Sequence, residues 1–373
     1  MWRFSVPICV LALLAALPAV ARAHGSPVQV VATGLDSPRH LAFGARGDLF
    51  VAEAGRGGSD RCFLGGEGPA CMGATGAVTE VDRRGHQHRI ISGLPSMANT
   101  PGDVNGIGPH GIAVLGADEV FITNGGPTEP KVGGPTGPDI PREELAKSTP
   151  AADLFGRVLW ITHHRAVKVA DIWGFERAHN PDAAVANPAI DSNPVDLLFD
   201  GLKIVVADAG GNALDVVRPF GGVSNLAVFP GGQGKTPAYQ AVPTAVVKGP
   251  DGFYYMSQLT GFPFIPGAAN IFRVNPRTGA YTVFKGGFTN LMDLAFGRDG
   301  TLYALSIAKN GLLNGTEGAI YAISRRGQVR ELALPAGTLN EPGGIAVGPG
   351  GLYVSNNGGS PGGGQVLKIR GRF

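Results

Sequence analysis

Two histidines and a group of acidic and amide residues occupy equivalent points of a short motif that repeats along the chain. The motif is an apolar strand, a turn rich in Gly, Pro or Asp, and a second apolar strand. The starts of the first strands carry His40, His110, Asp196 and Asp293. The ends of the second strands carry Glu53, Asn124, Asp208, Gln258 and Asn356. If the repeats surround one axis, these side chains converge on one mouth of a channel, which is where polar groups bind ligands.

One chemistry that suits this set is calcium binding. Glu53, Asn124 and Asp208 offer hard oxygen ligands. Ca²⁺ takes about six to eight such oxygens, including amide carbonyls and waters. These three residues are therefore the candidate metal ligands.

A second chemistry is acid–base catalysis. His40 or His110 can act as a general base if Asp196 or Asp293 orients the imidazole. The chain has no G-x-S-x-G, H-E-x-x-H or P-loop motif that would indicate another mechanism. A purely structural role also fits the residues that close the second strands, because acidic and amide side chains there often cap the following turn by bonding backbone N–H groups.

Six copies of the two-strand motif predict a repeat architecture. They begin near Pro38, Pro109, Pro194, Pro243, Leu291 and Pro342. The last three intervals are close to the roughly 40–50 residues of one four-stranded propeller blade. The first two intervals are longer and contain insertions. The fold class is therefore predicted to be all-β, a six-bladed β-propeller.

The sixth repeat lacks an outermost strand at the C-terminal end. Val28–Ala32 supplies a candidate just before the first repeat. Pairing it with Gly364–Ile369 would close the ring and hide the edges that an open sheet exposes. We therefore expect an N-terminal closing strand.

Three insertions interrupt the repeats. Ala54–Thr75 and Pro127–Phe155 are rich in Gly and Pro, and the second contains one expected helical turn at Pro141–Lys147. Asp171–Asn193 is expected to begin as a helix. These segments are predicted to be connecting loops that either partly roof the channel or are ordinary elaborations, and they could also bind a protein partner.

The N-terminus has the pattern of a secretory signal peptide. Arg3 supplies the positive region, Val6–Val20 is apolar, and Ala21–Ala23 is an A-x-A cleavage site. The alternative, an uncleaved anchor, needs a longer apolar run. We predict a signal peptide over residues 1–23 and a single propeller domain over 24–373, secreted or periplasmic and without a membrane span after cleavage.

Composition excludes two classes of protein. Gly (59 residues) and Pro (29 residues) fall at turns between apolar runs, and 43% of the residues are hydrophobic, so the chain is not disordered. Cleavage would remove Arg3 and Arg22 and no acidic residue, which leaves basic and acidic residues in balance. A nucleic-acid partner is therefore not expected, since it calls for a basic excess.

Two cysteines remain after cleavage, Cys62 and Cys71, on either side of a Gly-rich segment. In an exported chain this arrangement predicts a disulfide. A thiolate metal or redox site is the alternative, although the spacing matches no common motif and no His lies between them.

The chain resembles the ScyD/ScyE family, NHL-like propellers named for scytonemin biosynthesis. The resemblance covers essentially the whole mature chain and is carried by CFLGGEGPACMGATGAVTEVD (62–82), GPHGIAV (108–114), FGRVLWI (155–161), HNPDAAVANPAIDSNPVDLL (179–198), VVADAGGNALDVV (205–217), LAVFP (226–230), SQLTGFPFIPGAANIFRV (257–274), GFTNLMDLAFGRDGTLYAL (287–305), IAKNGL (307–312) and LYVSNNGGSPGGGQVLKI (352–369). It implies an exported six-bladed propeller, related in form to SMP-30, and leaves the chemistry open. Gly111 stands where the family has an Asp, which removes one carboxylate beside His110.

These observations lead to one principal functional hypothesis and two alternatives. The principal hypothesis is a protein that binds a small ring-bearing ligand at the channel mouth, with the aromatic segment Tyr254–Phe264 as a wall. Calcium lactonases and streptogramin lyases are built on similar propellers, so a Ca²⁺-dependent lactonase, hydrolase or lyase is the first alternative. A protein-binding scaffold is the second.

Overall fold

The computed structural model describes residues 27–65, 68–99, 106–126, 140–185, 189–232 and 238–373. The predicted signal peptide, residues 1–23, lies outside the described residues, as do residues 127–139 of the second insertion. None of the helices that the structure describes combines the length and hydropathy needed to cross a bilayer.

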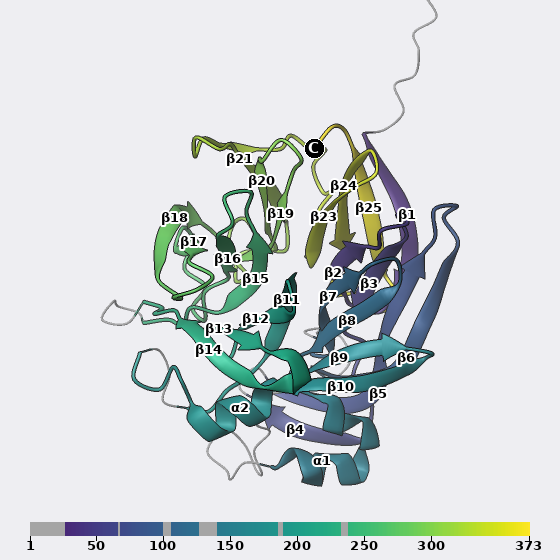
Figure 1. The fold of residues 1–373 in the computed structure, drawn as a ribbon. Coiled ribbons are helices and arrows are strands. Elements are labelled where there is room, and N and C mark those ends of the chain that lie inside the picture. The colour runs from purple at the N-terminus through teal and green to yellow at the C-terminus, as the bar shows by residue number, and fades with distance from the viewer. Residues whose placement is uncertain (1–26, 66–67, 100–105, 127–139, 186–188, 233–237) are drawn as a thin grey trace, which may run out of the picture.

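The described chain forms a six-bladed β-propeller, which confirms the predicted fold class (Figure 1). The first three blades contain β2 (Pro38–Phe43), β3 (Leu49–Glu53), β4 (Arg61–Gly65), β5 (Gly68–Val81) and β6 (Gln87–Asn99); β7 (Pro109–Leu115), β8 (Glu119–Asn124), β9 (Arg157–Thr162) and β10 (Arg165–Asp171); and β11 (Pro194–Asp200), β12 (Lys203–Asp208), β13 (Ala213–Val217) and β14 (Val223–Val228). The last three contain β15 (Pro243–Lys248), β16 (Tyr254–Gln258), β17 (Ala269–Val274) and β18 (Tyr281–Phe288); β19 (Leu291–Phe296), β20 (Leu302–Ser306), β21 (Ala319–Ile323) and β22 (Val329–Glu331); and β23 (Gly344–Gly348), β24 (Gly351–Asn356), β25 (Gly364–Arg370) and β1 (Val28–Leu35).

Apolar side chains on the facing sides of neighbouring sheets form the core. Between the third and fourth blades, Val205 and Leu214 pack in one cluster with Met256 and Phe272. Each strand contributes every second residue to such an interface, because side chains alternate between the two faces of a sheet. The innermost strands β2, β7, β11, β15, β19 and β23 contact one another in a closed ring around the axis.

The N-terminal strand closes the ring as predicted. β1 pairs antiparallel with β25, from Val28 opposite Ile369 to Leu35 opposite Gly364, and so becomes the outer strand of the sixth blade. Leu35 is fully buried among Leu41 and Val51 of the first blade and Val366 of the sixth. The closing strand therefore binds both neighbouring blades.

The prediction that Ala54–Thr75 is a loop was wrong. Its second half forms β4 and the beginning of β5, which pair with each other, and β6 extends to Asn99 alongside β5. The strands continue here because the long β6 supplies hydrogen-bond partners for the inserted backbone. The predicted disulfide is present and joins Cys62 to Cys71, which face each other in the β4–β5 pair.

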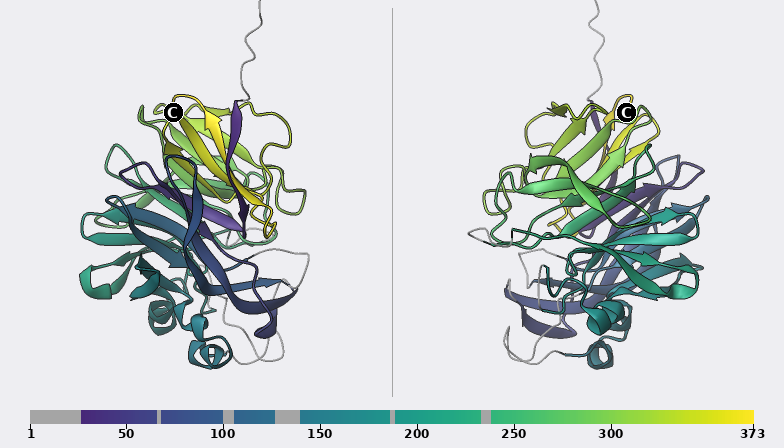
Figure 2. Two further views of the ribbon diagram at one scale, coloured as in Figure 1. Left: turned by 90° about the vertical axis from the view of Figure 1, so that its right-hand side faces the viewer. Right: turned by 60° about the vertical axis from the view of Figure 1, so that its left-hand side comes forward.

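The insertions of the first two blades pack against each other. The second insertion contains α1 (Arg142–Ser148), close to the predicted helical turn, and the short 3₁₀ helix Pro150–Leu154; α2 (Ile172–His179) begins the third insertion as expected. Phe63, Leu145, Phe155 and Trp173 share one buried cluster. In Figures 1 and 2 the two α-helices and β4 lie at one end of the molecule. Pro219–Gly221 forms a second 3₁₀ turn in the third blade.

The closing strand can be tested with a matched pair of substitutions. Leu35→Ala should lower the free energy of unfolding by about 2–5 kcal/mol, because it leaves a cavity between two blades. Val30→Ala, on the same strand with a side chain that is 48% exposed, should change it by less than about 1 kcal/mol. Urea denaturation of both variants measures the difference. Equal effects would mean that β1 does not contribute to the core.

Candidate functional site

Irregular pairing at the start of the innermost strands turns polar side chains toward the axis. The pairing of β2, β7, β11, β15 and β19 with their neighbours shifts register within the first residues of each strand. Such bulges re-aim individual side chains. Here they place His40, His110, Asp196 and Asp293 in one buried group at the centre of the ring.

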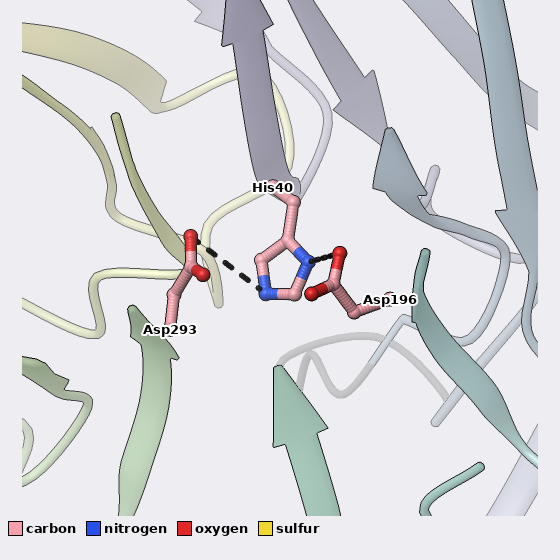
Figure 3. A group of neighbouring side chains, drawn as sticks. All are labelled: His40, Asp196 and Asp293. Atoms are coloured by element: carbon pink, nitrogen blue, oxygen red, sulfur yellow. Dashed lines mark hydrogen bonds and ion pairs between the residues drawn. The ribbon is translucent and has the colours of Figure 1, made fainter. Parts of the chain in front are cut away.

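His40 lies between two carboxylates (Figure 3). Its Nδ1 is 3.2 Å from Oδ1 of Asp196, and its Nε2 is 4.0 Å from Oδ2 of Asp293. Nε2 also lies 3.4 Å from the carbonyl oxygen of Met292. Both ring nitrogens therefore face acceptors, an arrangement that suits a doubly protonated imidazolium.

The two carboxylates are fixed by backbone donors on the next blade. Asp196 accepts a hydrogen bond from the amide of Val246 at 2.7 Å, and Asp293 accepts one from the amide of Ile345 at 2.7 Å. Asp293 also accepts one from its neighbour Leu294 at 2.6 Å. The positions of the acidic groups around His40 are thus set by the main chain.

The charges of the group are strongly coupled. Burial by itself lowers the pKa of His40, but the charges of Asp293 and Asp196 outweigh it and raise the pKa to about 9. Burial raises the pKa of Asp293 to about 7, with Asp196 adding to the effect and His40 opposing it. His40 is therefore a cation at neutral pH.

His110 has the opposite protonation state. Its ring meets that of His40 edge to face, with the centroids 5.2 Å apart. Burial, and then the charges of His40 and Arg39, hold the pKa of His110 well below 6.5. Nδ1 lies 2.9 Å from the carbonyl oxygen of Val195, an acceptor, so Nδ1 carries the proton and Nε2 keeps a lone pair.

Gly111, beside His110, is packed too tightly for a larger residue. A Cβ at this position would lie 2.5 Å from the Cα of Asp196 and 2.8 Å from Oγ1 of Thr123. The Asp that the family resemblance expects here would not fit without displacing β11. The channel therefore takes its carboxylates from Asp196 and Asp293.

Arg39 is a residue of the site that the sequence did not single out. It is buried, and its Nη2 donates to the carbonyl oxygen of Gly106 at 2.8 Å. In the described part of the chain its Nε has no hydrogen-bond partner, and no carboxylate lies within 4 Å of it. Burial lowers the pKa of Arg39 to about 10, against the charge of Glu341. Its position directly before His40 was the available signal.

The structure places Glu53 in a separate ion-pair group. Its carboxylate accepts hydrogen bonds from Arg89 at 2.6 and 3.0 Å, from the amide of Asp36 and from the hydroxyl of Thr79. The lone pairs that a metal ion would need are thus engaged by an arginine and two neutral donors.

Of the other residues that close second strands, Gln258 and Asn356 accept hydrogen bonds from backbone N–H groups, of Asn270 in β17 and of Asn340, as a capping role requires. Asn124 differs, because its amide donates to the carbonyl oxygen of Gly125 and its Oδ1 is buried without a hydrogen-bond partner in the described part of the chain. Asp208 accepts from the hydroxyl of Ser192 and from the amides of Asn193 and Gly211. Glu53, Asn124 and Asp208 share none of these hydrogen-bond partners, so the structure gives the three residues distinct environments.

Among the described residues, His40, Asp196 and Asp293 form the one group of three acidic or histidine side chains with ligand atoms within 4.8 Å of one another. This group fits a proton better than a metal ion. Both ring nitrogens of His40 face oxygen acceptors, and both carboxylates already accept backbone hydrogen bonds. We therefore derive no step that uses a metal in the channel.

Comparison with known proteins supports the fold. No family model and no curated protein sequence matches the chain. A solved structure described as a gluconolactonase from Xanthomonas campestris has a TM-score of 0.51 and 12% identity, covering 92% of this chain and 89% of that one. Another gluconolactonase structure has a TM-score of 0.50 and 11% identity, covering 94% and 95%. A glucose dehydrogenase-type oxidoreductase from Thermus thermophilus has a TM-score of 0.50 and 19% identity, covering 91% and 98%.

At these identities the comparisons establish the propeller fold alone. The resemblance to the ScyD/ScyE family stays a prediction from the sequence motifs. Export stays a prediction too, and the disulfide is compatible with it.

The protonation of His40 can be measured directly. NMR titration should give His40 a midpoint near pH 9, and Asp293→Asn should lower it, because one of the two stabilising charges is lost. Asp299→Asn, in an exposed turn, is the control and should leave the midpoint unchanged.

The same shift predicts the sign of a pH effect on stability. The pKa of His40 is raised in the folded chain. Its contribution to the free energy of unfolding is therefore complete below pH 6.5 and is lost as the pH rises through about 9. A His40 midpoint near 6.5 in the wild type would contradict this description of the group.

Proposed function

We propose that this propeller binds a small, ring-bearing anion at the channel mouth. The observation that carries the proposal is Arg39, a buried guanidinium without an ion-pair partner in the described chain, beside His40 and His110. A buried cation is costly unless it is paired, so a carboxylate or phenolate ligand would supply the missing charge. Guanidinium groups bind carboxylates through paired N–H donors.

The aromatic segment after β16 supports a ring-bearing ligand. Phe262 is 73% exposed and lies edge to face with Phe264 at 6.1 Å between centroids. Exposed aromatic side chains provide contact area for rings at binding sites. The proposal takes this segment as one wall of the site.

A test of binding uses one ring-bearing acid and its neutral isostere. Isothermal titration should show that the wild type binds indole-3-acetate at least tenfold more tightly than indole-3-acetamide. Arg39→Gln should remove this preference, because the amide side chain carries no charge. Arg56→Gln is the matched control, since its side chain is 62% exposed. Equal affinity of the acid for the wild type and for Arg39→Gln would show that Arg39 does not bind the carboxylate.

Acid–base catalysis at the same site is the second candidate. The observation that favours it is that the pKa values of two neighbouring histidines are shifted in opposite directions. His40 is charged and His110 is neutral, and both lie near Asp293, whose pKa is about 7. Neighbouring groups whose pKa values diverge are typical of acid and base pairs. Lactone hydrolysis fits: water attacks the carbonyl carbon, His110 Nε2 takes its proton, and the same proton returns to the ring oxygen as the C–O bond breaks.

Hydrolysis of dihydrocoumarin, a ring-bearing lactone, tests this candidate. His110→Asn should reduce kcat/KM at least 100-fold, because it removes the base, and EDTA should leave the wild-type rate unchanged. His86→Asn is the control, since that side chain is 74% exposed in a turn. Turnover that survives in His110→Asn, or that is lost with EDTA, would overturn this mechanism.

A further inference from the structure

A second charged side chain lies near Arg39 at the mouth of the channel. It is Glu341, in the bend that leads into β23, the innermost strand of the sixth blade. The charge of Glu341 raises the pKa of Arg39, although burial lowers that pKa by more. The two side chains are therefore close enough to interact.

The two groups do not neutralise each other by direct contact. Within the described chain, no carboxylate oxygen of Glu341 lies within 4.0 Å of a side-chain nitrogen of Arg39. The carboxylate of Glu341 also has no hydrogen-bond or ion-pair partner among the described residues. Glu341 is only half-buried, so a ligand can reach it.

Two adjacent glycines keep the space beside these groups free of side chains. A Cβ on Gly358 would lie 3.2 Å from Nη1 of Arg39, and a Cβ on Gly359 would lie 2.9 Å from Cδ of Glu341. Side chains at these positions would displace the guanidinium and the carboxylate. The turn after β24 thus passes both charged groups without placing a side chain of its own against them.

A buried donor close to Arg39 also lacks a partner. Like Nε of Arg39, Oγ of Ser37 has no hydrogen bond among the described residues, although Ser37 is fully buried. Both side chains border Gly106, whose carbonyl oxygen accepts from Nη2 of Arg39 and on which a Cβ would lie 3.4 Å from Oγ of Ser37. Buried donors are costly to leave unsatisfied, and a ligand carboxylate supplies acceptors for them.

The charges at the mouth favour a ligand that carries both signs of charge. Arg39 and His40 are the cations, and Asp196, Asp293 and Glu341 are the carboxylates near them. A carboxylate bound to Arg39 adds a further negative charge, which an ammonium group on the same ligand would balance. Such compensation matters because charges removed from water are stable only when they are paired.

We propose that the ligand bound at Arg39 is a ring-bearing amino acid, whose carboxylate pairs with Arg39 and whose ammonium group pairs with Glu341. This inference rests on the proposed function, which places a carboxylate at Arg39, and adds a second charged anchor. A guanidinium binds a carboxylate through paired N–H donors, and an ammonium group donates to a carboxylate that is free to accept. Anchors of opposite charge also select against molecules that carry only one charged group.

The test compares L-phenylalanine with 3-phenylpropanoate, which has the same ring and carboxylate but no ammonium group. In isothermal titration the wild type should bind L-phenylalanine at least tenfold more tightly. Glu341→Gln should abolish this preference, because the amide carries no charge, and should bind 3-phenylpropanoate at least as tightly as the wild type does. Glu143→Gln, at an exposed position of α1, is the matched control and should keep the preference.

The results separate this inference from the function on which it rests. If both ligands bind the wild type equally and Arg39→Gln weakens both at least tenfold, the carboxylate site stands and the ammonium site is refuted. A preference for L-phenylalanine that survives in Glu341→Gln would refute the role of Glu341. If neither ligand binds the wild type at 5 mM, both the inference and the proposed function are contradicted. The wild-type comparison decides the ammonium site even if Glu341→Gln does not fold.

Discussion

The structure depends on buried polar side chains that join the inner edge of each blade to the main chain of the next. The six sheets of the described chain share no backbone ladder, and only isolated backbone bonds, such as that from the amide of Ala45 to the carbonyl oxygen of Gly116, cross between blades, so most polar ties between the inner strands come from side chains. The bonds around the axis are His110 to Val195, Asp196 to Val246, Thr244 to Leu291, Asp293 to Ile345, Ser355 to Arg39 and Arg39 to Gly106. The ring is therefore closed by hydrogen bonds at its centre as well as by β1 at its rim.

This arrangement explains why the channel residues have such unequal pKa values. Side chains that bridge blades must be buried, and buried charges must be compensated. His40 receives two carboxylates, whereas His110 receives only a carbonyl and stays neutral. Architecture and electrostatics are thus set by the same contacts, and a substitution at Asp196 or Asp293 alters both.

The sequence predicted those parts of the fold whose signals are local. The hairpins, the start of α2 and the closing strand follow from turn residues, apolar alternation and the missing edge of the sixth blade. The continuation of β5 and β6 was missed because it depends on their mutual register, which no local pattern specifies.

The site was predicted in the same uneven way. His40, His110, Asp196 and Asp293 were expected at one mouth because they occupy equivalent positions in the repeats, and they do meet. The partner of Glu53 was not foreseen, because Arg89 lies 36 residues away on an outer strand. The surroundings of Asp208 were not foreseen either. They include Glu176 of α2, which belongs to an insertion that follows no repeat.

The pairing of β1 with β25 also has a consequence for how the chain folds. Val28 meets Ile369, so the first and last strands of the described chain complete one sheet. During synthesis from the N-terminus, β1 stays unpaired until nearly all of the described chain has been made. Contacts of such long sequence separation form slowly, because the intervening chain must first be ordered. The sixth blade therefore forms late. Until it forms, two sheet edges stay open and can pair with strands of other molecules.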